Sequence, residues 1–116
     1  MPERMNENGA TFNAGVLADY VVETDMELRY IRVSEGFCKI LGYDRWELLG
    51  KRVAEITAPH TNNISVIFEL FLRNRYMYGI WVFVSRSGTT KIFVRYEARL
   101  RFNGIECTME LIGGGA

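Results

Sequence analysis

The last part of the chain constrains the fold most, because it predicts two strands joined by a tight turn. Residues 91–102 alternate between apolar and mostly charged side chains, which is the period of a half-buried strand. Residues 105–112 alternate in the same way, and Asn103-Gly104 between the two is a strong hairpin signal. Residues 79–85, apolar on both faces, predict a third strand in an antiparallel meander. The apolar face of the longest strand comprises Ile92, Val94, Tyr96, Ala98, Leu100 and Phe102.

Two shorter strands precede a helical section. Residues 19–24 and 28–33 are rich in β-branched and aromatic side chains and predict an amino-terminal hairpin. Apolar residues then recur at helical spacing, and Gly42 is the predicted C-cap of a first short helix. A second short helix over residues 45–49 follows Asp44, whose side chain is a good helix cap.

A longer helix is predicted over residues 63–74, with Asn62 or Asn63 as its N-cap. Its apolar stripe consists of Ile64, Ile67, Phe68 and Phe71. A sheet and helices that each carry one apolar face bury those faces against each other. We therefore expect an α+β domain, with a five-stranded antiparallel sheet and short helices packed on one of its faces.

A length of 116 residues fits one domain, which we expect over residues 15–112. Residues 1–14 are polar and predict a flexible lead-in or cap, and residues 113–116 predict a glycine-rich tail or linker. The sequence contains neither a membrane-spanning apolar stretch nor a basic-then-apolar leader. We therefore expect a cytoplasmic domain that does not contact a membrane.

Charge and cysteine usage narrow the function classes. Lys plus Arg number 14 and Asp plus Glu number 14, whereas a nucleic-acid binder carries a basic excess or cluster. Cys38 and Cys107 stand far apart and have no zinc-ligand spacing. We expect no direct contact with nucleic acid and no metal site.

Two motifs in the helical section are the most specific in the chain. They are Phe37-Cys38-x-x-Leu41-Gly42-Tyr43 and Glu47-Leu48-Leu49-Gly50-Lys51. Weaker stretches are Glu23-Thr24-Asp25, Glu55-Ile56-Thr57-Ala58-Pro59 and Ser85-Arg86-Ser87-Gly88. In this order and ahead of three strands, they resemble the PAS family of sensory and dimerisation domains. The resemblance covers about residues 18–112.

The resemblance implies the spatial strand order 2-1-5-4-3, helices on the concave face and often a small internal cavity. Such domains often precede a histidine kinase, a cyclic-dinucleotide enzyme or a transcription regulator, so the resemblance implies an effector, either attached or as a partner protein. Separately, we expect a homodimer. An ion pair between Glu47 and Arg86 is implied by position. The chain departs from the family at Ser34, where Asn is usual, and at Ser87, where Asp is usual.

The cofactor-binding branches of the family are matched poorly. Flavin photosensors resemble Gly-x-Asn-Cys where this chain has Gly50, Lys51, Arg52 and Val53, and valine cannot form the flavin adduct. Haem sensors use an axial ligand, typically a histidine on the long helix, whereas the only histidine, His60, precedes that helix. We expect neither haem nor flavin, and leave an unknown small molecule open.

The sequence shows no catalytic constellation. A Ser–His or Cys–His nucleophile would have to use His60, and the chain has neither a nucleophile elbow nor a phosphate loop. We expect no enzymatic activity. A remote alternative is a small enzyme with a buried acid or base drawn from Glu23, Asp25 and Glu97.

The favoured function is a sensor for a small, largely apolar ligand. Apolar side chains from the helices and from the sheet face they cover would line its cavity. The candidates are Phe37, Leu41, Leu49, Val53, Ile56, Ile67, Phe71, Phe83, Tyr96 and Met109.

A ligand-free docking or dimerisation module is the alternative. If Trp81 and Phe83 point to the core, the opposite face of their strand needs cover. That face carries Ile80, Val82 and Val84, and its cover would be a second subunit or the amino-terminal Phe12, Val16 and Leu17.

Overall fold

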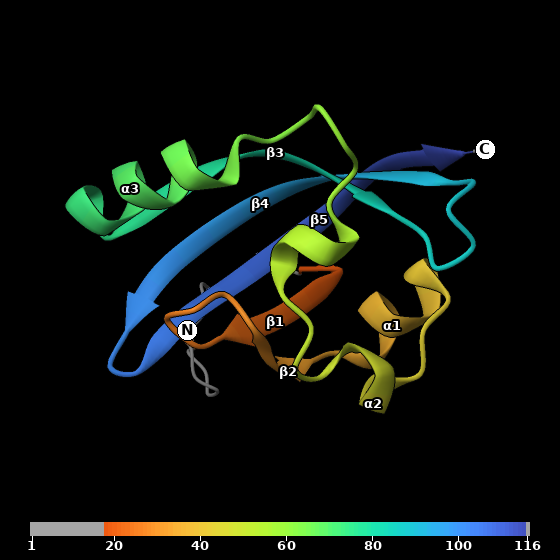
Figure 1. The fold of residues 1–116 in the computed structure, drawn as a ribbon, viewed down its shortest axis with the longest axis horizontal. Helices are drawn as coiled ribbons and strands as arrows, with labels where there is room; N and C mark the ends of the chain where they lie inside the picture. The colour runs from red at the N-terminus through yellow and green to blue at the C-terminus, as the bar shows by residue number, and fades with distance from the viewer. Residues whose placement is uncertain (1–17, 116) are drawn as a thin grey trace, which may run out of the picture.

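The computed structural model describes residues 18–115. Its elements are β1 (Tyr20–Thr24), β2 (Tyr30–Val33), α1 (Glu35–Leu41), α2 (Arg45–Leu48), the 3-10 helix η1 (Val53–Ile56), α3 (Ile64–Asn74), β3 (Tyr76–Val84), β4 (Lys91–Arg101) and β5 (Gly104–Gly115). The strands form one antiparallel sheet in the order β2-β1-β5-β4-β3 (Figure 1). The α+β class and the strand order are confirmed.

The β4–β5 hairpin forms where the alternating pattern predicted it. Its pairing runs from Arg101↔Gly104 to Lys91↔Gly115, with one irregularity in register beside Phe93. A Cβ on Gly104 would clash with the carbonyl oxygen of Thr24 on β1, so this turn position requires glycine. The turn thereby brings β5 close enough to pair with β1.

The ends of the strands differ from the prediction in three places. β5 continues through Gly115 along β4, so residues 113–115 are not an unstructured tail. Glycines carry no side chains, and therefore an alternating pattern cannot reveal a strand that contains them. β3 begins at Tyr76 instead of residue 79. Phe102 lies in the hairpin turn and is 98% exposed, although the alternation placed it on the buried face.

The short helices follow their predicted caps. Gly42 has φ 84°, and its N–H donates to the carbonyl oxygens of Cys38 and Lys39, which ends α1. At the start of α2, Glu47 Oε1 accepts a hydrogen bond from the Asp44 N–H at 2.8 Å. These bonds set the end of α1 and the start of α2, and the two helices contact β1 and β2, respectively.

Asn63, not Asn62, caps α3. Its side-chain oxygen accepts from the Val66 N–H at 3.3 Å. The Asn62 side chain instead pairs with the edge of β3: Nδ2 donates to the Ile80 oxygen at 2.9 Å, and Oδ1 accepts from the Val82 N–H at 3.1 Å. The Asn62 side chain thus bonds to the backbone of β3 as a neighbouring strand would, and it anchors the start of α3 to the sheet.

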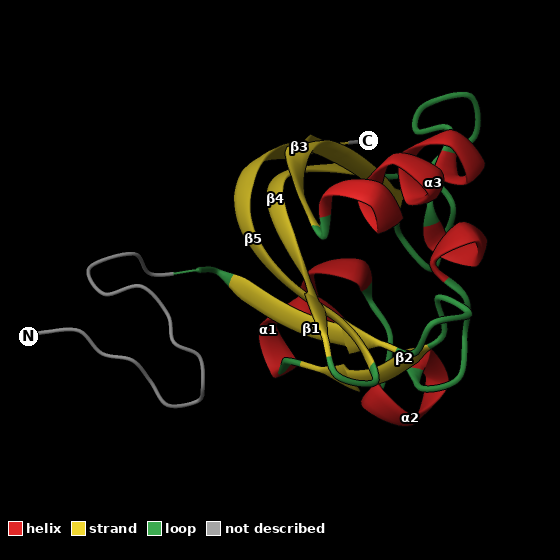
Figure 2. Ribbon diagram, turned by 90° about the vertical axis from the view of Figure 1, so that its left-hand side faces the viewer, coloured by secondary structure: helices red, strands yellow, loops and turns green. Residues whose placement is uncertain are grey.

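The sheet is strongly curved, and α3 faces its concave side (Figure 2). Side chains from all five strands build the core together with residues of α1, α2, η1 and α3. Its most deeply buried large members are Tyr30, Phe37, Leu41, Leu48, Ile56, Val22 and Val94.

Candidate functional site

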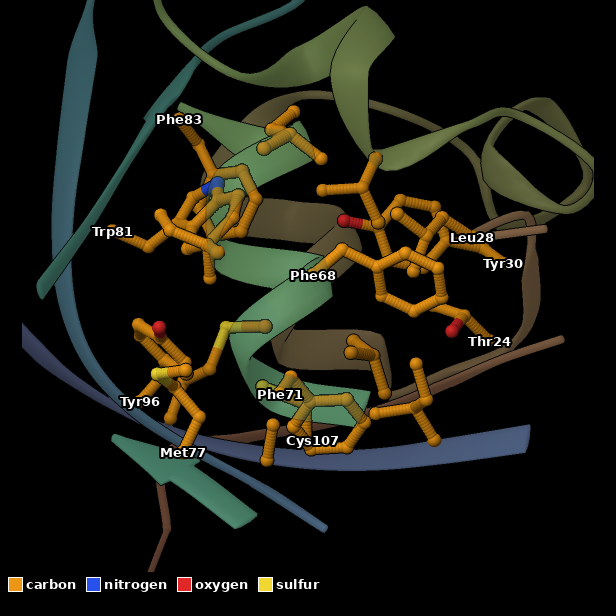
Figure 3. Close-up of a pocket in the computed structure, with 17 residues that line it drawn as sticks. Thr24, Leu28, Tyr30, Phe68, Phe71, Met77, Trp81, Phe83, Tyr96 and Cys107 are labelled. Carbon is orange, nitrogen blue, oxygen red and sulfur yellow. The ribbon is translucent and has the colours of Figure 1, made fainter. Parts of the chain in front are cut away.

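An apolar pocket of about 90 Å³ lies between α3 and the inner face of the sheet (Figure 3). Its wall takes side chains from every strand, from η1 and from α3. An engineered apolar cavity of about 150 Å³ takes up benzene. The present pocket therefore suits a compact molecule of a few non-hydrogen atoms.

The structure brings together part of the predicted site. The predicted residues that line the pocket are Val53, Ile67, Phe71, Phe83, Tyr96 and Met109. Phe37, Leu41 and Ile56 are fully buried core residues that do not line it. Leu49 is 41% exposed, because α2 ends at Leu48 and buries that residue in its place. Whether a ligand touches the lining residues stays a prediction.

Sequence reasoning missed much of the wall. The missed residues are Val22, Thr24, Leu28, Tyr30, Ile64, Phe68, Met77, Trp81, Ala98, Ile105 and Cys107. Most are inward-facing positions of β1, β3, β4 and β5, so the alternating pattern could have shown that they face inward. Which end of the sheet lies beneath α3 could not be read from that pattern.

Five side chains in the wall carry an N–H, O–H or S–H group, and three of them make hydrogen bonds. Trp81 Nε1 donates to Thr57 Oγ1 at 3.0 Å, and Thr24 Oγ1 donates to the Asp25 carbonyl oxygen at 3.0 Å. Cys107 Sγ donates a weak hydrogen bond to the Thr108 carbonyl oxygen at 3.9 Å, and the hydroxyls of Tyr30 and Tyr96 are the other two polar groups.

Burial keeps these three groups protonated. Burial raises the pKa of Tyr96 to about 12, and it raises the pKa of Tyr30 well above its ordinary value. Burial likewise raises the pKa of the Cys107 thiol to about 12. The pocket wall is therefore uncharged at neutral pH, and it suits a neutral ligand better than a carboxylate or an amine.

The acids of the enzyme alternative lie away from the pocket. Glu97 pairs with Arg99 at 3.0 Å, and Glu23 pairs with Arg32 at 3.6 Å. Asp25 accepts backbone hydrogen bonds within the β1–β2 turn. None of the three acids lines the pocket, so the structure lends the alternative no support.

The predicted ion pair is present in the structure. Arg86 lies 2.9 Å from Glu47 Oε2, and the Arg86 N–H donates to the Leu41 oxygen at 2.8 Å. The other carboxylate oxygen of Glu47 caps α2. Glu47 thus ties α2 to the turn between β3 and β4.

The positions tested for cofactors are dispersed. His60 lies in an exposed turn with φ 62° and does not line the pocket. Cys38 is buried in α1, also away from the pocket. Within residues 18–115, no three His, Cys, Asp or Glu residues gather as potential metal ligands.

The candidate interface differs from the prediction in one residue. Trp81 and Phe83 are buried on the inner face, as expected, and Ile80 on the outer face is 47% exposed. Val82 is already buried, because Phe93 lies opposite it and the segment around Ala58 pairs with its backbone. Val84 is partly buried. The predicted covering residues Phe12, Val16 and Leu17 lie outside the described residues.

An apolar patch nevertheless remains on the outer face. It consists of Tyr78, Ile80 and Phe93, which we call the outer patch. Within the described residues, no helix is long and apolar enough to cross a membrane.

Solved structures establish the fold. The PAS domain of an HTR-like protein from Haloarcula marismortui matches with a TM-score of 0.68 and 19% identity, over 81% of each chain. A PAS domain from Colwellia psychrerythraea matches with a TM-score of 0.70 and 16% identity, over 80% of this chain and 85% of that one. A PAS domain from a two-component sensor histidine kinase gives 0.67 and 14%, over 79% and 83%. No family model matches the sequence, and no curated protein matches it.

Proposed function

We propose that this chain, whose fold is that of PAS domains, is a sensory signalling domain that binds a small, neutral and largely apolar molecule. The observation that carries the proposal is the apolar pocket between α3 and the sheet. Its occupancy biases an effector that is part of the same protein or a partner. The domain itself catalyses no reaction and acts in the cytoplasm.

The position of α3 supports a sensing role. This helix packs chiefly against β3, and Phe71 is its only buried residue. Ile64, Ile67, Phe68 and Phe71 of α3 line the pocket. A ligand that binds differently to two positions of α3 shifts the balance between them, which is the requirement for a sensor.

The similar domain from a two-component sensor histidine kinase supports an effector of that class. A cyclic-dinucleotide enzyme or a transcription regulator would be served by the same arrangement. Which of these effectors is regulated depends on the domain or partner protein to which this domain is connected.

The experiment is native mass spectrometry of the purified protein, followed by release of any bound compound under denaturing conditions. Ile67→Trp places a large side chain in the pocket, whereas Val66→Trp changes the neighbouring residue that faces solvent. We expect a co-purified molecule in the wild type and in Val66→Trp, and its loss in Ile67→Trp. Equal retention in the two variants would place the molecule elsewhere and refute the proposal for this pocket.

The outer patch favours a second role as a homodimerisation module. Tyr78 and Ile80 are successive outward residues of β3, and Phe93 of β4 lies opposite Val82, the next outward residue; all three expose apolar surface. Light scattering over a concentration series tests this role, with Ile80→Lys as the disruptive variant. A wild-type monomer at high micromolar concentration would exclude a dimer.

A further inference from the structure

The free edge of β3 is only partly covered by other residues. β3 ends the sheet and pairs on one side alone, with β4 (Figure 2). Along its second half, the Ala58 N–H donates to the Val82 oxygen. The Asn62 side chain bonds to the Val82 N–H and to the Ile80 oxygen. Within residues 18–115, no hydrogen bond of this kind reaches the first half of the strand, before Ile80.

Alternate residues of β3 direct their backbone groups to this free edge. In an antiparallel sheet, the N–H and C=O of one residue point to one neighbouring strand and those of the next residue point to the other. Ile80 and Val82 face the free edge, as their bonds to Asn62 show. Tyr76 and Tyr78 face it too, because β3 pairs with β4 without a break in register. Four groups at the edge are thus unpaired among the described residues: the N–H groups of Tyr78 and Ile80, and the C=O groups of Tyr76 and Tyr78.

The open stretch lacks the features that usually protect an edge strand. Natural edges carry charged side chains, proline or bulges, which discourage pairing with another chain. Residues 76–80, Tyr-Met-Tyr-Gly-Ile, contain neither a charge nor a proline, and they pair with β4 without a bulge. At the opposite edge of the sheet, by contrast, Gly50 and Lys51 bond to the backbone of Tyr30 on β2. Residues 76–80 are therefore open to a partner strand.

This stretch is complementary to a second copy of itself. Asn62 closes the edge at Ile80, so the uncovered residues are centred on Tyr78. A two-fold axis at Tyr78 sets this residue opposite the partner's Tyr78, and it sets Ile80 opposite the partner's Tyr76. The side chains that meet are uncharged and exposed: Tyr76 39%, Tyr78 71% and Ile80 47%. Aromatic and aliphatic cross-strand pairs of this kind stabilise a sheet.

Resting on the homodimerisation role proposed above, we infer that two copies of this chain pair edge to edge through β3 and form one continuous sheet. The Tyr78 N–H donates to the oxygen of the partner's Tyr78. The Ile80 N–H donates to the oxygen of the partner's Tyr76, and the two-fold axis doubles both bonds. Asn62 keeps its own bonds and ends the pairing at Ile80, which fixes the register. Because the contact is short, we expect a weak, reversible dimer.

The test measures amide hydrogen exchange by NMR over a concentration series of the full chain, while light scattering follows dimerisation. We expect exchange at Tyr78 and Ile80 to slow as the dimer forms, because their N–H groups enter the new hydrogen bonds. Met77 and Gly79 are the internal control, since their N–H groups face β4 and stay protected at every concentration. A dimer in which Tyr78 and Ile80 exchange as fast as in the monomer would overturn the inference and leave the homodimerisation role standing.

Two substitutions at one position separate backbone pairing from side-chain contact. Tyr78→Pro removes the N–H that faces the edge and leaves the bonds to β4 intact, whereas Tyr78→Thr removes the same ring and keeps the N–H. We expect Tyr78→Pro to weaken dimerisation roughly tenfold more than Tyr78→Thr, because symmetry removes two hydrogen bonds. Equal weakening would contradict pairing through the backbone. The exchange measurement needs no variant, so it decides the inference even if Tyr78→Pro does not fold.

Two other results would also contradict edge pairing. Protection of the Tyr78 and Ile80 amides at every concentration would show that another segment of the same chain occupies the edge. A monomer at high micromolar concentration would refute both edge pairing and the homodimerisation role. The proposed binding of a small molecule between α3 and the sheet would stand in either case.

Discussion

The two ends of the inner sheet face are packed differently. Beneath α1 and α2, Phe37, Leu41 and Leu48 are fully buried and belong to a closed core. At the other end, α3 covers a pocket, while Val66 and Leu70 on its opposite side remain 49% and 43% exposed. The same sheet therefore supports a dense closed end and an open end. The open space is a local property of the α3 end, where a ligand would have to enter.

The connections of the two ends differ as well. Gly42, the Glu47 cap and the Glu47–Arg86 pair hold α1 and α2 in place. The start of α3 is held by the side chains of Asn62 and Asn63. Phe71 is the one buried residue of α3, whereas α1 and α2 together bury four residues. We therefore expect a lower local stability at the open end, and moving elements are usually drawn from regions of low local stability.

The largest expected change in stability comes from truncating one aliphatic side chain at the closed end and one at the open end. Leu41→Ala empties a fully buried site and is expected to lower the free energy of unfolding by about 3–5 kcal/mol. Ile67→Ala enlarges an existing pocket at a partly buried site and is expected to cost about 1–2 kcal/mol. Urea unfolding measures both changes. Equal losses would show that the two ends are equally well packed.

Alkaline pH is expected to destabilise the protein through the open end. In the unfolded chain the Cys107 thiol loses its proton near its ordinary pKa of 9.0, whereas the folded protein retains it up to about 12. Between these values the unfolded state binds fewer protons, so stability falls as pH rises, by up to about 1.4 kcal/mol per pH unit for this group.

Cys107→Ala tests the assignment of this pH effect. Urea unfolding between pH 8 and pH 11 is expected to show a shallower decline for the variant than for the wild type. An unchanged decline would mean that the thiol is not protected by burial in the folded state.

The smallest expected change in the free energy of unfolding comes from removing the Glu47–Arg86 ion pair at the closed end. Arg86→Ala removes a partly exposed ion pair and is expected to cost less than about 1 kcal/mol. Glu47→Ala also removes the cap of α2 and is expected to cost about 1–2 kcal/mol. Chemical unfolding of the two variants and of the double variant gives the comparison. If Arg86→Ala lowered the free energy of unfolding more than Glu47→Ala does, Glu47 would not serve both as the cap of α2 and as the partner of Arg86.

The sequence predicted most of the fold because its signals are local. Alternation identified β4 and the first part of β5, and Gly42, Asp44 and Asn63 marked the ends of helices where the structure has them. Signals of this kind depend on neighbouring residues alone. The glycines at the end of β5 carry no such signal, and only pairing with β4 shows that they form a strand.

The site was predicted less completely because it depends on distant contacts. Tyr96 and Phe71 were identified as inward-facing, and both line the pocket. Phe37 and Leu41 have equally good inward patterns, yet they lie at the closed end. The two pairs differ because α3 lies over one end of the sheet, where Asn62 anchors the start of the helix to β3. This long-range contact could not be read from periodicity.

The α3 end of the sheet holds a pocket that admits small apolar molecules, whereas the α1 end is closed. The most direct measurement is a xenon titration followed by methyl NMR, because xenon enters apolar cavities without needing a hydrogen bond. We expect shifts that saturate at Ile67 and Met109 and are absent at Leu41 and Leu48. Equal shifts at both ends, or none at Ile67 and Met109, would contradict this expectation.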